Sequence, residues 1–368
     1  MNVPKLRFKE FNDEYKSIKL KDVSEIYDGT HETPNYVEKG VKFVSVENIS
    51  NLLDTTKFIP ESDYNKYKIK PKYNDVFMTR IGDIGTSSIY KSDEELAYYV
   101  SLALLRTKDN HILIPDYLNQ YIKNNSFQKE LYNRTIHVAF PKKINTGEIG
   151  ECSINLCSDK EQLKVSNFLS LLDKKIELQS KKIEDLKLFK LYIRKKIFSS
   201  NTNNNIRLKE IVNCESSNIT LADIENDNGI YPVYGATGFI KNIKNYKFDS
   251  EYIAIVKDGA GVGRTMICPK NSSILTTMNA LTIKNNYPLN YICEMINTIS
   301  FDKYIVGSGI PHIYFKDYGN EEFMLHNEND ANKFDSVFKC LDRKIELLNV
   351  SLDKLNILKK GLMQGMFV

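Results

Sequence analysis

The chain has 368 residues, of which 42% are hydrophobic and 27% are charged, and its formal net charge is +4. This composition excludes a disordered chain, and the length allows two or more domains that each bury a core. The mild positive charge is compatible with a nucleic-acid partner but does not require one. No apolar run approaches the ~20 residues of a membrane span, and the charged N-terminus lacks the apolar core of a signal peptide.

Groups that could support catalysis or bind a metal are sparse. Six cysteines occur without a CxxC pair or a neighbouring histidine pair, which argues against a zinc site and favours reduced thiols in a cytoplasmic protein. The five histidines are scattered and form no Ser/His/Asp pattern. No Pro-Pro pair is present for the Asn/Asp-Pro-Pro-aromatic tetrad of an amino-methyltransferase. We therefore predict that the chain catalyses nothing.

The first part of the chain mixes short apolar runs with turn signals. Runs that are typical of strands occupy residues 41–46, 75–79 and 97–105. A helix is predicted over residues 116–131. The glycine-containing stretch at 80–86 follows a strand and precedes residues 87–90, which resemble a returning strand. A dinucleotide-binding loop would need a helix after its glycines, so this pattern favours a strand–turn–strand hairpin.

A long helix is predicted next, because neither Pro nor Gly occurs from residue 151 to residue 228. Ser158 and Glu161 have the spacing of a capping box at its beginning. Apolar residues then recur at alternating steps of four and three, which is typical of a coiled-coil seam. The seam residues are Leu172, Ile176, Ile183 and Leu186, with Gln179 and Lys190 in the same register. A polar stretch at 199–205 reads as a linker.

The second part of the chain repeats the first. LDKKIEL at Leu172 returns as LDRKIEL at Leu341, 169 positions later, and residues 18–23 resemble residues 206–211. Strands are predicted at 252–256 and 280–283, a helix at 289–300, and a second glycine turn at 257–264. The second seam comprises Leu341, Ile345, Leu348, Leu352 and Leu355, with Lys359 in the register of Lys190.

The repeat predicts the order variable segment, helix, variable segment, helix. The fold class is α+β, with a pseudo-two-fold internal repeat and two long helices that pack antiparallel as a coiled coil. The alternative is that each helix is only the amphipathic edge of its own domain.

This order of segments resembles the specificity (S) subunit of Type I restriction–modification systems. Residues 3–8 are similar to the usual opening of these subunits, although Tyr15 stands where a Trp is common. The stretch at 29–36 is similar to a loop in one class of target-recognition domain, whereas those at 229–235, 259–263 and 307–312 are similar to a second class. Residues 359–367 resemble the typical ending.

The resemblance implies a target-recognition domain at residues 1–157, a helical spacer at 158–200, a second target-recognition domain at 201–326 and a C-terminal helical spacer at 327–368. Each domain would read one half of a split double-stranded DNA site, and the helices would dock two modification subunits. No cofactor is expected in this chain. S-adenosylmethionine, ATP and Mg are expected on the partners, which include restriction subunits.

Candidate DNA-binding residues are polar side chains on or near the predicted turns. Arg and Lys can pair with guanine, and Asn and Gln with adenine, but half or more of the contacts should go to phosphate. An ordinary surface or turn-forming role is the alternative for each residue, and for any single position we favour it. The candidates are Thr79, Arg80, Asp83, Ser87, Arg134, His137, Lys142 and Lys143 in the first domain, and Lys257, Arg264, Thr277, Asn279, Ser308 and His312 in the second.

Two other functions remain open from the residues alone. A coiled-coil scaffold whose α+β domains bind protein would assemble without sequence-dependent DNA binding. A stand-alone enzyme that used the glycine turns would bind a nucleotide through Gly261 or Gly263. Close packing of the two helical glycines Gly361 and Gly365 against the other helix or a partner is a further hypothesis, because glycine weakens a helix interior.

Overall fold

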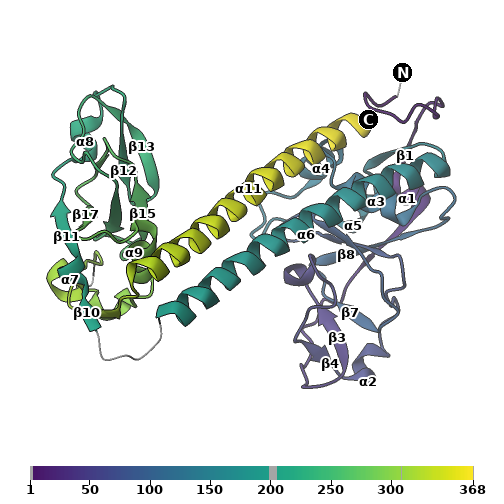
Figure 1. Cartoon of the computed structure of the whole chain (residues 1–368). Helices are drawn as coiled ribbons and strands as arrows, with labels where there is room; N and C mark the ends of the chain where they lie inside the picture. Colours follow the sequence, from purple (N-terminus) through teal and green to yellow (C-terminus); the bar gives the residue numbers. More distant parts are fainter. Residues whose placement is uncertain (1–2, 199–204, 308, 368) are drawn as a thin grey trace. The chain divides into compact units, whose positions relative to one another are not determined.

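The computed structural model describes residues 3–198, 205–307 and 309–367, and it divides into two compact units (Figure 1). Unit 1 consists of Met1–Gln179 and Ser351–Val368, and unit 2 consists of Ser180–Val350. Each unit therefore contains one variable segment together with parts of both long helices. In the residues described, no helix combines the length and the apolar character that a membrane span requires.

Unit 1 contains domain 1, which runs from strand β1 to strand β9. A two-stranded sheet pairs β1 with β9, a four-stranded sheet has the order β2-β8-β5-β6, and a three-stranded sheet has the order β4-β3-β7. All pairs are antiparallel except β3 with β7. The bounds are β1 Lys16–Lys19, α1 Leu20–Val23, β2 Ser24–Asp28, β3 Val41–Val44, η1 Val46–Asn48, β4 Phe58–Ile59, α2 Glu61–Tyr64, β5 Val76–Thr79, β6 Ser87–Ile89, β7 Leu96–Tyr98, β8 Leu102–Thr107, α3 Pro115–Ile122, α4 Asn125–Arg134, α5 Thr146–Gly150 and β9 Ser153–Leu156.

Unit 2 contains domain 2, which runs from strand β10 to strand β18 and repeats this plan. Its sheets have the orders β10-β18, β11-β17-β14-β15 and β13-β12-β16. The bounds are β10 Asn205–Arg207, α7 Leu208–Ile211, β11 Val212–Ser216, α8 Leu221–Ile224, β12 Tyr231–Gly235, β13 Gly238–Ile243, β14 Tyr252–Val256, β15 Thr265–Cys268, β16 Ser273–Ile274, β17 Met278–Ile283, α9 Leu289–Ile296, η2 Phe301–Tyr304, α10 Phe315–Tyr318 and β18 Glu322–Met324. The predicted α+β class with an internal repeat is confirmed.

The central strands β5 and β14 are almost entirely apolar because both of their faces are buried. Successive side chains of a strand point to opposite faces. In β5, Val76 and Met78 join the core beneath α3 and α4, whereas Phe77 joins a separate core on the other face. Strand β14 divides in the same way, with Ile253 and Ile255 in one core and Tyr252, Ala254 and Val256 in another. Strands buried on both faces give continuous apolar runs instead of alternation.

The two long helices are α6, Asp159–Phe198, and α11, Glu328–Met366 (Figure 1). At the beginning of α6 the Ser158 hydroxyl accepts the Glu161 amide at 3.4 Å, which is half of the predicted capping box. The Glu161 carboxylate instead accepts bonds from Arg7 at 2.8 and 2.7 Å and from the Tyr15 hydroxyl at 3.0 Å. Glu161 therefore fastens the N-terminal segment to the helix.

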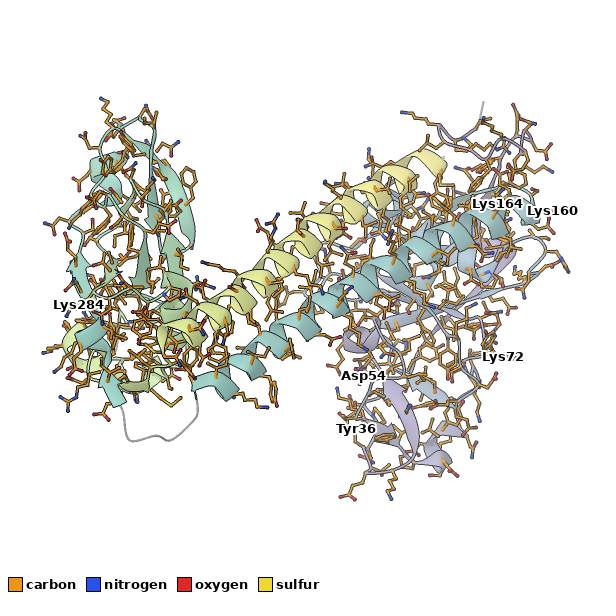
Figure 2. All side chains as sticks on the ribbon, in the orientation of Figure 1. Tyr36, Asp54, Lys72, Lys160, Lys164 and Lys284 are labelled. Carbon is orange, nitrogen blue, oxygen red and sulfur yellow. The ribbon has the colours of Figure 1, made fainter. Side chains whose placement is uncertain are left out.

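The N-terminal segment continues along the same helix end. Figure 2 shows Lys160 and Lys164 in the first turns of α6, and Lys164 pairs with Glu10. The Leu6 amide donates to the Gly365 carbonyl at 2.8 Å, and a Cβ on Gly365 would lie 2.6 Å from the Leu6 side chain. Gly365 therefore packs closely, on Leu6 and not on the other helix. Gly361 has no neighbour at its Cβ position among the described residues, so close packing of Gly361 against a partner stays a prediction.

Within each unit the two helices run antiparallel. In unit 1, Val165 and Leu169 share a core with Met363 and Met366, while Asp173, one turn further along α6, pairs with Lys359. In unit 2, Lys190 lies 2.6 Å from Asp342. Phe198 at the C-terminal end of α6 and Phe334 near the beginning of α11 pack against one core. The predicted seam residues are buried or half-buried, namely Leu172, Ile176, Ile183, Leu186, Leu341, Ile345, Leu348, Leu352 and Leu355.

Three predicted element boundaries were wrong. The apolar run at 97–105 forms two strands, β7 and β8, because the Leu102 amide turns back to the Tyr99 carbonyl at 3.0 Å. The predicted helix at 116–131 is interrupted where the Asn124 side chain accepts the Ser126 amide at 2.7 Å and begins α4. Helix α9 ends at Ile296, earlier than residue 300. Of the predicted linker, residues 199–204 lie outside the described residues, and Asn205 begins β10.

Candidate nucleic-acid interface

Each domain carries a tight glycine turn between two central strands. Turn 1, residues 80–86, joins β5 to β6, and turn 2, residues 257–264, joins β14 to β15. The amide of Gly85 donates to the Thr79 carbonyl at 3.0 Å, and that of Gly263 donates to the Val256 carbonyl at 2.9 Å. Both turns lead into an antiparallel strand, so the predicted hairpins are confirmed and neither turn has the helix of a dinucleotide site.

A second loop is hydrogen-bonded to each turn. Loop 1 comprises residues 136–143, and loop 2 comprises the described residues 306–307 and 309–312. In each loop the first residue pairs with the last. The Gly82 amide donates to the Lys142 carbonyl and the Gly259 amide to the Pro311 carbonyl, both at 2.9 Å. Just after the loops, the Ile144 amide donates to the Arg80 carbonyl and the Ile313 amide donates to the Lys257 carbonyl, both at 3.0 Å. We call each turn with its loop the turn–loop edge of that domain.

The edge of domain 1 is basic where it is exposed. Lys142, Lys143 and His137 are exposed on loop 1, and Asp83 is exposed on turn 1. The His137 ring lies 4.4 Å from that of Tyr132, and its Nε2 contacts the Tyr132 carbonyl at 2.9 Å. The lysines can neutralise phosphate, His137 and Asp83 can bond to base edges, and all four are brought together by the turn and loop.

Other candidates in domain 1 are buried and hold the edge in place. The Arg80 guanidinium donates to the Ile144 carbonyl at 3.0 Å and to the Val100 carbonyl at 3.1 Å, and it lies 3.0 Å from the Asp28 carboxylate. The Ser87 hydroxyl is 2.9 Å from the Asn119 amide oxygen, and Thr79 accepts the Thr86 amide at 3.0 Å. Arg80 thus ties loop 1 to the domain from beneath.

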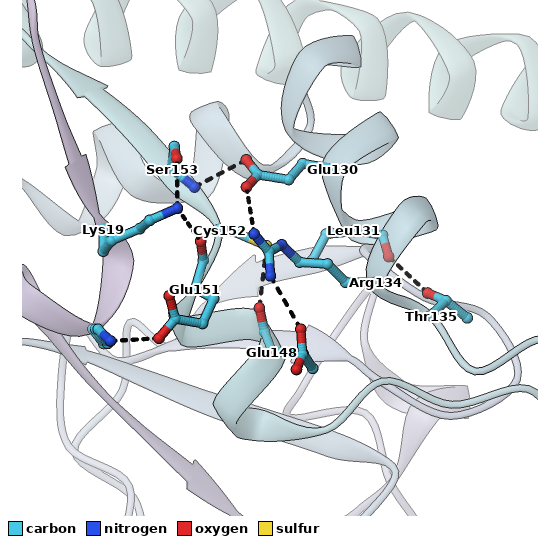
Figure 3. Close-up of polar contacts among 10 residues, drawn as sticks. Lys19, Glu130, Leu131, Arg134, Thr135, Glu148, Glu151, Cys152 and Ser153 are labelled. Atoms are coloured by element: carbon cyan, nitrogen blue, oxygen red, sulfur yellow. Dashed lines mark hydrogen bonds and ion pairs between the residues drawn. The ribbon is translucent and has the colours of Figure 1, made fainter.

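Arg134 belongs to a network of polar contacts between helices (Figure 3). It pairs with Glu130 at 3.3 Å and with Glu148 at 3.1 Å. Glu130 also accepts the Ser153 amide at 2.9 Å. The guanidinium therefore links α4 to α5, while Glu130 links α4 to β9. Nothing in this arrangement aims Arg134 at a ligand.

The edge of domain 2 has different side chains on the same backbone. Arg264 is exposed, and Lys257 is half-buried. The His312 ring pairs with the Asp258 carboxylate across the turn and the loop, so Asp258 is a site residue that sequence reasoning missed. Aligning the two turns could have indicated Asp258, because it occupies the position of Ile81 in turn 1 and each of these residues pairs with the last residue of its loop.

The remaining candidates of domain 2 support this edge or lie beyond the description. The half-buried Thr277 accepts the Lys257 amide at 2.9 Å through its carbonyl. Asn279 is buried and accepts a bond from the Ser216 hydroxyl at 2.9 Å. Ser308 lies outside the described residues.

Comparison with known proteins adds to this geometry. A family model, the Type I restriction modification DNA specificity domain, matches the chain twice, over residues 12–188 and 201–356. No curated protein matches the sequence. The crystal structure of a Type I restriction–modification system S subunit from M. genitalium is 17% identical, with a TM-score of 0.69, and the match covers 100% of this chain and 99% of that one.

A second solved structure, from work on complex assembly and conformational transition of the type I R-M system, is 11% identical with a TM-score of 0.56. That match covers 96% of this chain and 97% of the other. Identities this low show a shared fold, whereas the two family matches span most of the chain and fall on both repeats. The chain therefore belongs to the Type I restriction modification DNA specificity family, as an S subunit with two target-recognition domains and no catalytic role of its own.

Proposed function

We propose that this chain reads a bipartite DNA site, one half-site with each domain, and that its helices dock two modification subunits. The observation that carries the DNA-reading role is the duplicated turn–loop edge. Two domains keep the same backbone bonds between turn and loop, yet one exposes Lys142 and Lys143, whereas the other exposes Arg264 beside a half-buried His312–Asp258 pair. A constant frame with different hydrogen-bonding groups suits two readers of two unlike half-sites.

The docking role is supported by exposed apolar side chains that repeat along the helices. Large apolar residues exposed to solvent mark interaction surfaces when they recur together. Several exposed apolar positions of α6 recur on α11 169 positions later, which is also the spacing of Leu172 and Leu341. The pairs are Phe168 and Val337, Leu178 and Leu347, Leu188 and Ile357, and Phe189 and Leu358. Two like sets of apolar positions suit two like partners.

The chemistry would then reside in the partners. Modification subunits would supply S-adenosylmethionine and methylate adenine, and restriction subunits would supply ATP-driven and Mg-dependent steps. Linking two readers in one chain makes binding of the second half-site intramolecular, which raises the overall affinity without any new contact.

The test of DNA reading is to co-express this chain with the methyltransferase encoded beside it and to map modified adenines genome-wide. We expect a split motif with a fixed spacer that disappears when this chain is omitted. Replacing residues 80–86 and 136–143 with the corresponding residues of another S subunit should change only one half of the motif. A stable complex without sequence-dependent methylation would support the scaffold function instead.

The test of docking uses matched charge substitutions. Leu178→Asp and Leu347→Asp should each weaken capture of one methyltransferase subunit, and the double variant should abolish capture, as measured by native mass spectrometry. Leu221→Asp is the control, because Leu221 is equally exposed but lies on α8 within domain 2. Unchanged stoichiometry in the double variant would contradict docking through these positions.

A further inference from the structure

The turn–loop edges present apolar side chains that the proposed base and phosphate contacts leave unexplained. On loop 1, Val138 and Phe140 are 97% and 105% exposed, the highest values among large apolar side chains in the described residues. On loop 2, Ile310 is 71% exposed. A single exposed apolar side chain is common on proteins. Here they recur on the matching loop of two domains whose loop sequences otherwise differ, with Phe140 one position further than Ile310 from the residue bonded to the glycine turn.

Both loops place the apolar residue directly before a proline, which is followed by two exposed lysines on loop 1 and by the Asp258-paired His312 on loop 2. Loop 1 reads Phe140-Pro141-Lys142-Lys143, and loop 2 reads Ile310-Pro311-His312. Loop 1 is one residue longer, since Gly82 bonds to Lys142 where Gly259 bonds to Pro311. The apolar residue followed by proline is therefore present in both loops although their lengths differ.

The loops are held firmly beneath these residues. Loop 1 is closed by the Ile136 amide on the Lys143 carbonyl at 2.8 Å, and loop 2 by the Val306 amide on the His312 carbonyl at 2.9 Å. Each is also bonded to its glycine turn, and Arg80 fixes the residue that follows loop 1. Because these backbone bonds already fix both ends of each loop, placing the exposed side chain against a ligand has less backbone left to order.

The flanking charges indicate what these side chains meet. On loop 1, Lys142 and Lys143 are exposed directly after Phe140-Pro141, and lysine is depleted from the cores of protein–protein interfaces. Phe, Ile and Pro are among the residues that enter base steps as wedges, where neighbouring cations bind the phosphates. Duplex DNA fits this combination better than an apolar protein surface.

We propose that Phe140-Pro141 and Ile310-Pro311 are wedges, each inserting at a base step of the half-site read by its own domain and bending the duplex there. This inference rests on the proposed DNA-reading function and deepens it. Insertion requires partial unstacking, which is easiest at pyrimidine–purine steps. The wedges would therefore favour flexible steps in each half-site, including base pairs that no polar side chain touches.

The experiment uses the full chain assembled with its methyltransferase and a duplex that carries the mapped motif, labelled at both ends for energy transfer. Phe140→Ala should abolish the bend at the first half-site and weaken binding roughly tenfold to a hundredfold, the range found for lost base–aromatic contacts. The salt dependence of binding should stay unchanged, because no phosphate contact is lost. Ile310→Ala should act in the same way at the second half-site.

Matched variants separate the wedge from other roles. Phe140→Leu should retain most of the bend, because Leu is also a wedge residue. Lys142→Gln should lower the salt dependence and keep the bend. Tyr73→Ala, which removes a half-exposed aromatic outside both turn–loop edges, should change neither the bend nor the affinity.

The outcomes are distinguishable. Specific binding by the unaltered complex with a bend that persists in Phe140→Ala and Ile310→Ala would overturn the wedge and leave the DNA-reading function intact. Weaker binding with an unaltered bend would assign these residues to base-edge contacts and also overturn the wedge. Loss of methyltransferase capture would assign the loops to protein docking. No specific binding by the unaltered complex would overturn the DNA-reading function and the wedge together.

Discussion

Domain 1 and domain 2 have the same arrangement of strands and helices, but different side chains connect them to the long helices. In α3 of domain 1, Gln120 donates to Asp173 of α6 at 2.9 Å, and Asp173 pairs with Lys359. The equivalent residue in α9 of domain 2 is Glu294, which is buried and lies 2.7 Å from Lys190 and 2.6 Å from Arg194. One domain is therefore held by a neutral donor and the other by a buried carboxylate.

The repeat therefore preserves a side-chain contact between the domain helix and α6 at this position, but not the charge of the residue that makes it. Each anchor also touches a helix residue that bridges to the other helix within its unit, Asp173 in one case and Lys190 in the other. A buried carboxylate with two cations depends on its partners far more than an amide does, because an unpaired buried charge is costly. The two domains should consequently respond very differently to the same substitution.

The largest expected effect is at Glu294. Glu294→Ala leaves Arg194 and Lys190 without their buried partner and should destabilise unit 2 by about 3–5 kcal/mol. Gln120→Ala removes the hydrogen bond to Asp173 and a longer one to Ser170 at 3.4 Å, both from a neutral donor, and should cost unit 1 only about 1–2 kcal/mol. Thermal unfolding followed by hydrogen exchange in α9 and α3 measures both. Equal losses in the two variants would refute the contrast between the anchors.

The next effect concerns the glycine turns. Gly85 and Gly263 both have positive φ, at +93° and +83°, and an added Cβ would lie 2.6 Å from the Gln128 amide or 2.5 Å from the Phe301 ring. The Phe301 ring is buried and cannot bend, whereas the longer Gln128 side chain can rotate away by giving up its 2.7 Å hydrogen bonds to the Gly85 and Ile122 carbonyls. Gly263→Ala should therefore cost about 3 kcal/mol and Gly85→Ala about half of that.

Gly82→Ala and Gly259→Ala are matched controls for these turn variants, since both have positive φ but open space where the Cβ would be. They should show only the strain of the left-handed backbone, about 1 kcal/mol each. Melting temperatures of the four variants would decide between overlap and strain. A control as unstable as Gly263→Ala would show that overlap with Phe301 is unimportant.

A smaller effect is expected from the lysines of the two seams. Lys190 is 14% exposed and pairs with Glu294 and Asp342, whereas Lys359 is 25% exposed and pairs with Asp173. Lys190→Met should cost about 1–2 kcal/mol because Glu294 keeps only Arg194, and Lys359→Met about 0–1 kcal/mol. Denaturant unfolding monitored by hydrogen exchange in each unit would compare them, and a larger loss for Lys359→Met would reverse the ranking.

The smallest effect is a pH dependence confined to unit 2. Burial lowers the pKa of His326 from its ordinary 6.5, and its Nδ1 lies 2.8 Å from the Tyr291 hydroxyl. The folded state favours the neutral ring, so this stability is present above pH 6.5 and is lost as the pH falls through the lowered pKa. Domain 1 has Cys157 at the equivalent position, where burial raises the thiol pKa to about 12.

Melting curves between pH 5 and pH 8, with His326→Gln as the comparison, test this dependence. We expect the unaltered unit 2 to lose stability toward pH 5 more steeply than the variant, because Gln does not ionise. Unit 1 should show no such dependence from Cys157, whose thiol stays neutral throughout this range. An identical slope in the variant would remove His326 as the cause.

The sequence predicted features that depend on periodicity and on repetition. The steps of four and three placed both seams, because burial along a paired helix follows that period. The hairpins after Thr79 and Val256 were also predictable, since glycines followed by an apolar run and no helix leave few alternatives. The break in the run at 97–105 was not, because a turn made by backbone bonds at Tyr99 leaves no Gly or Pro signal.

Site residues were harder to predict, because their roles depend on neighbours distant in sequence. Arg80 and Lys142 occur in similar turn contexts, yet Arg80 is buried by a carbonyl 64 positions away while Lys142 is exposed. Arg134 is taken up by Glu130 and Glu148. Phe140 carried no signal at all, since an apolar residue in a sequence is normally interpreted as core. Only the three-dimensional pairing of turn and loop separates these cases.

The inter-helix ion pairs are interchangeable between the two halves of the chain. Asp173 and Lys190 on α6 have the same separation as Asp342 and Lys359 on α11 (173 to 190, 342 to 359). Two copies of α6 laid antiparallel would match Asp173 with Lys190 twice and would need no charge from α11. Each long helix thus carries both the acidic and the basic residue that an antiparallel pair needs, and α11 repeats the two that α6 carries. Either domain can therefore change the side chains of its turn–loop edge without any compensating change in these inter-helix ion pairs.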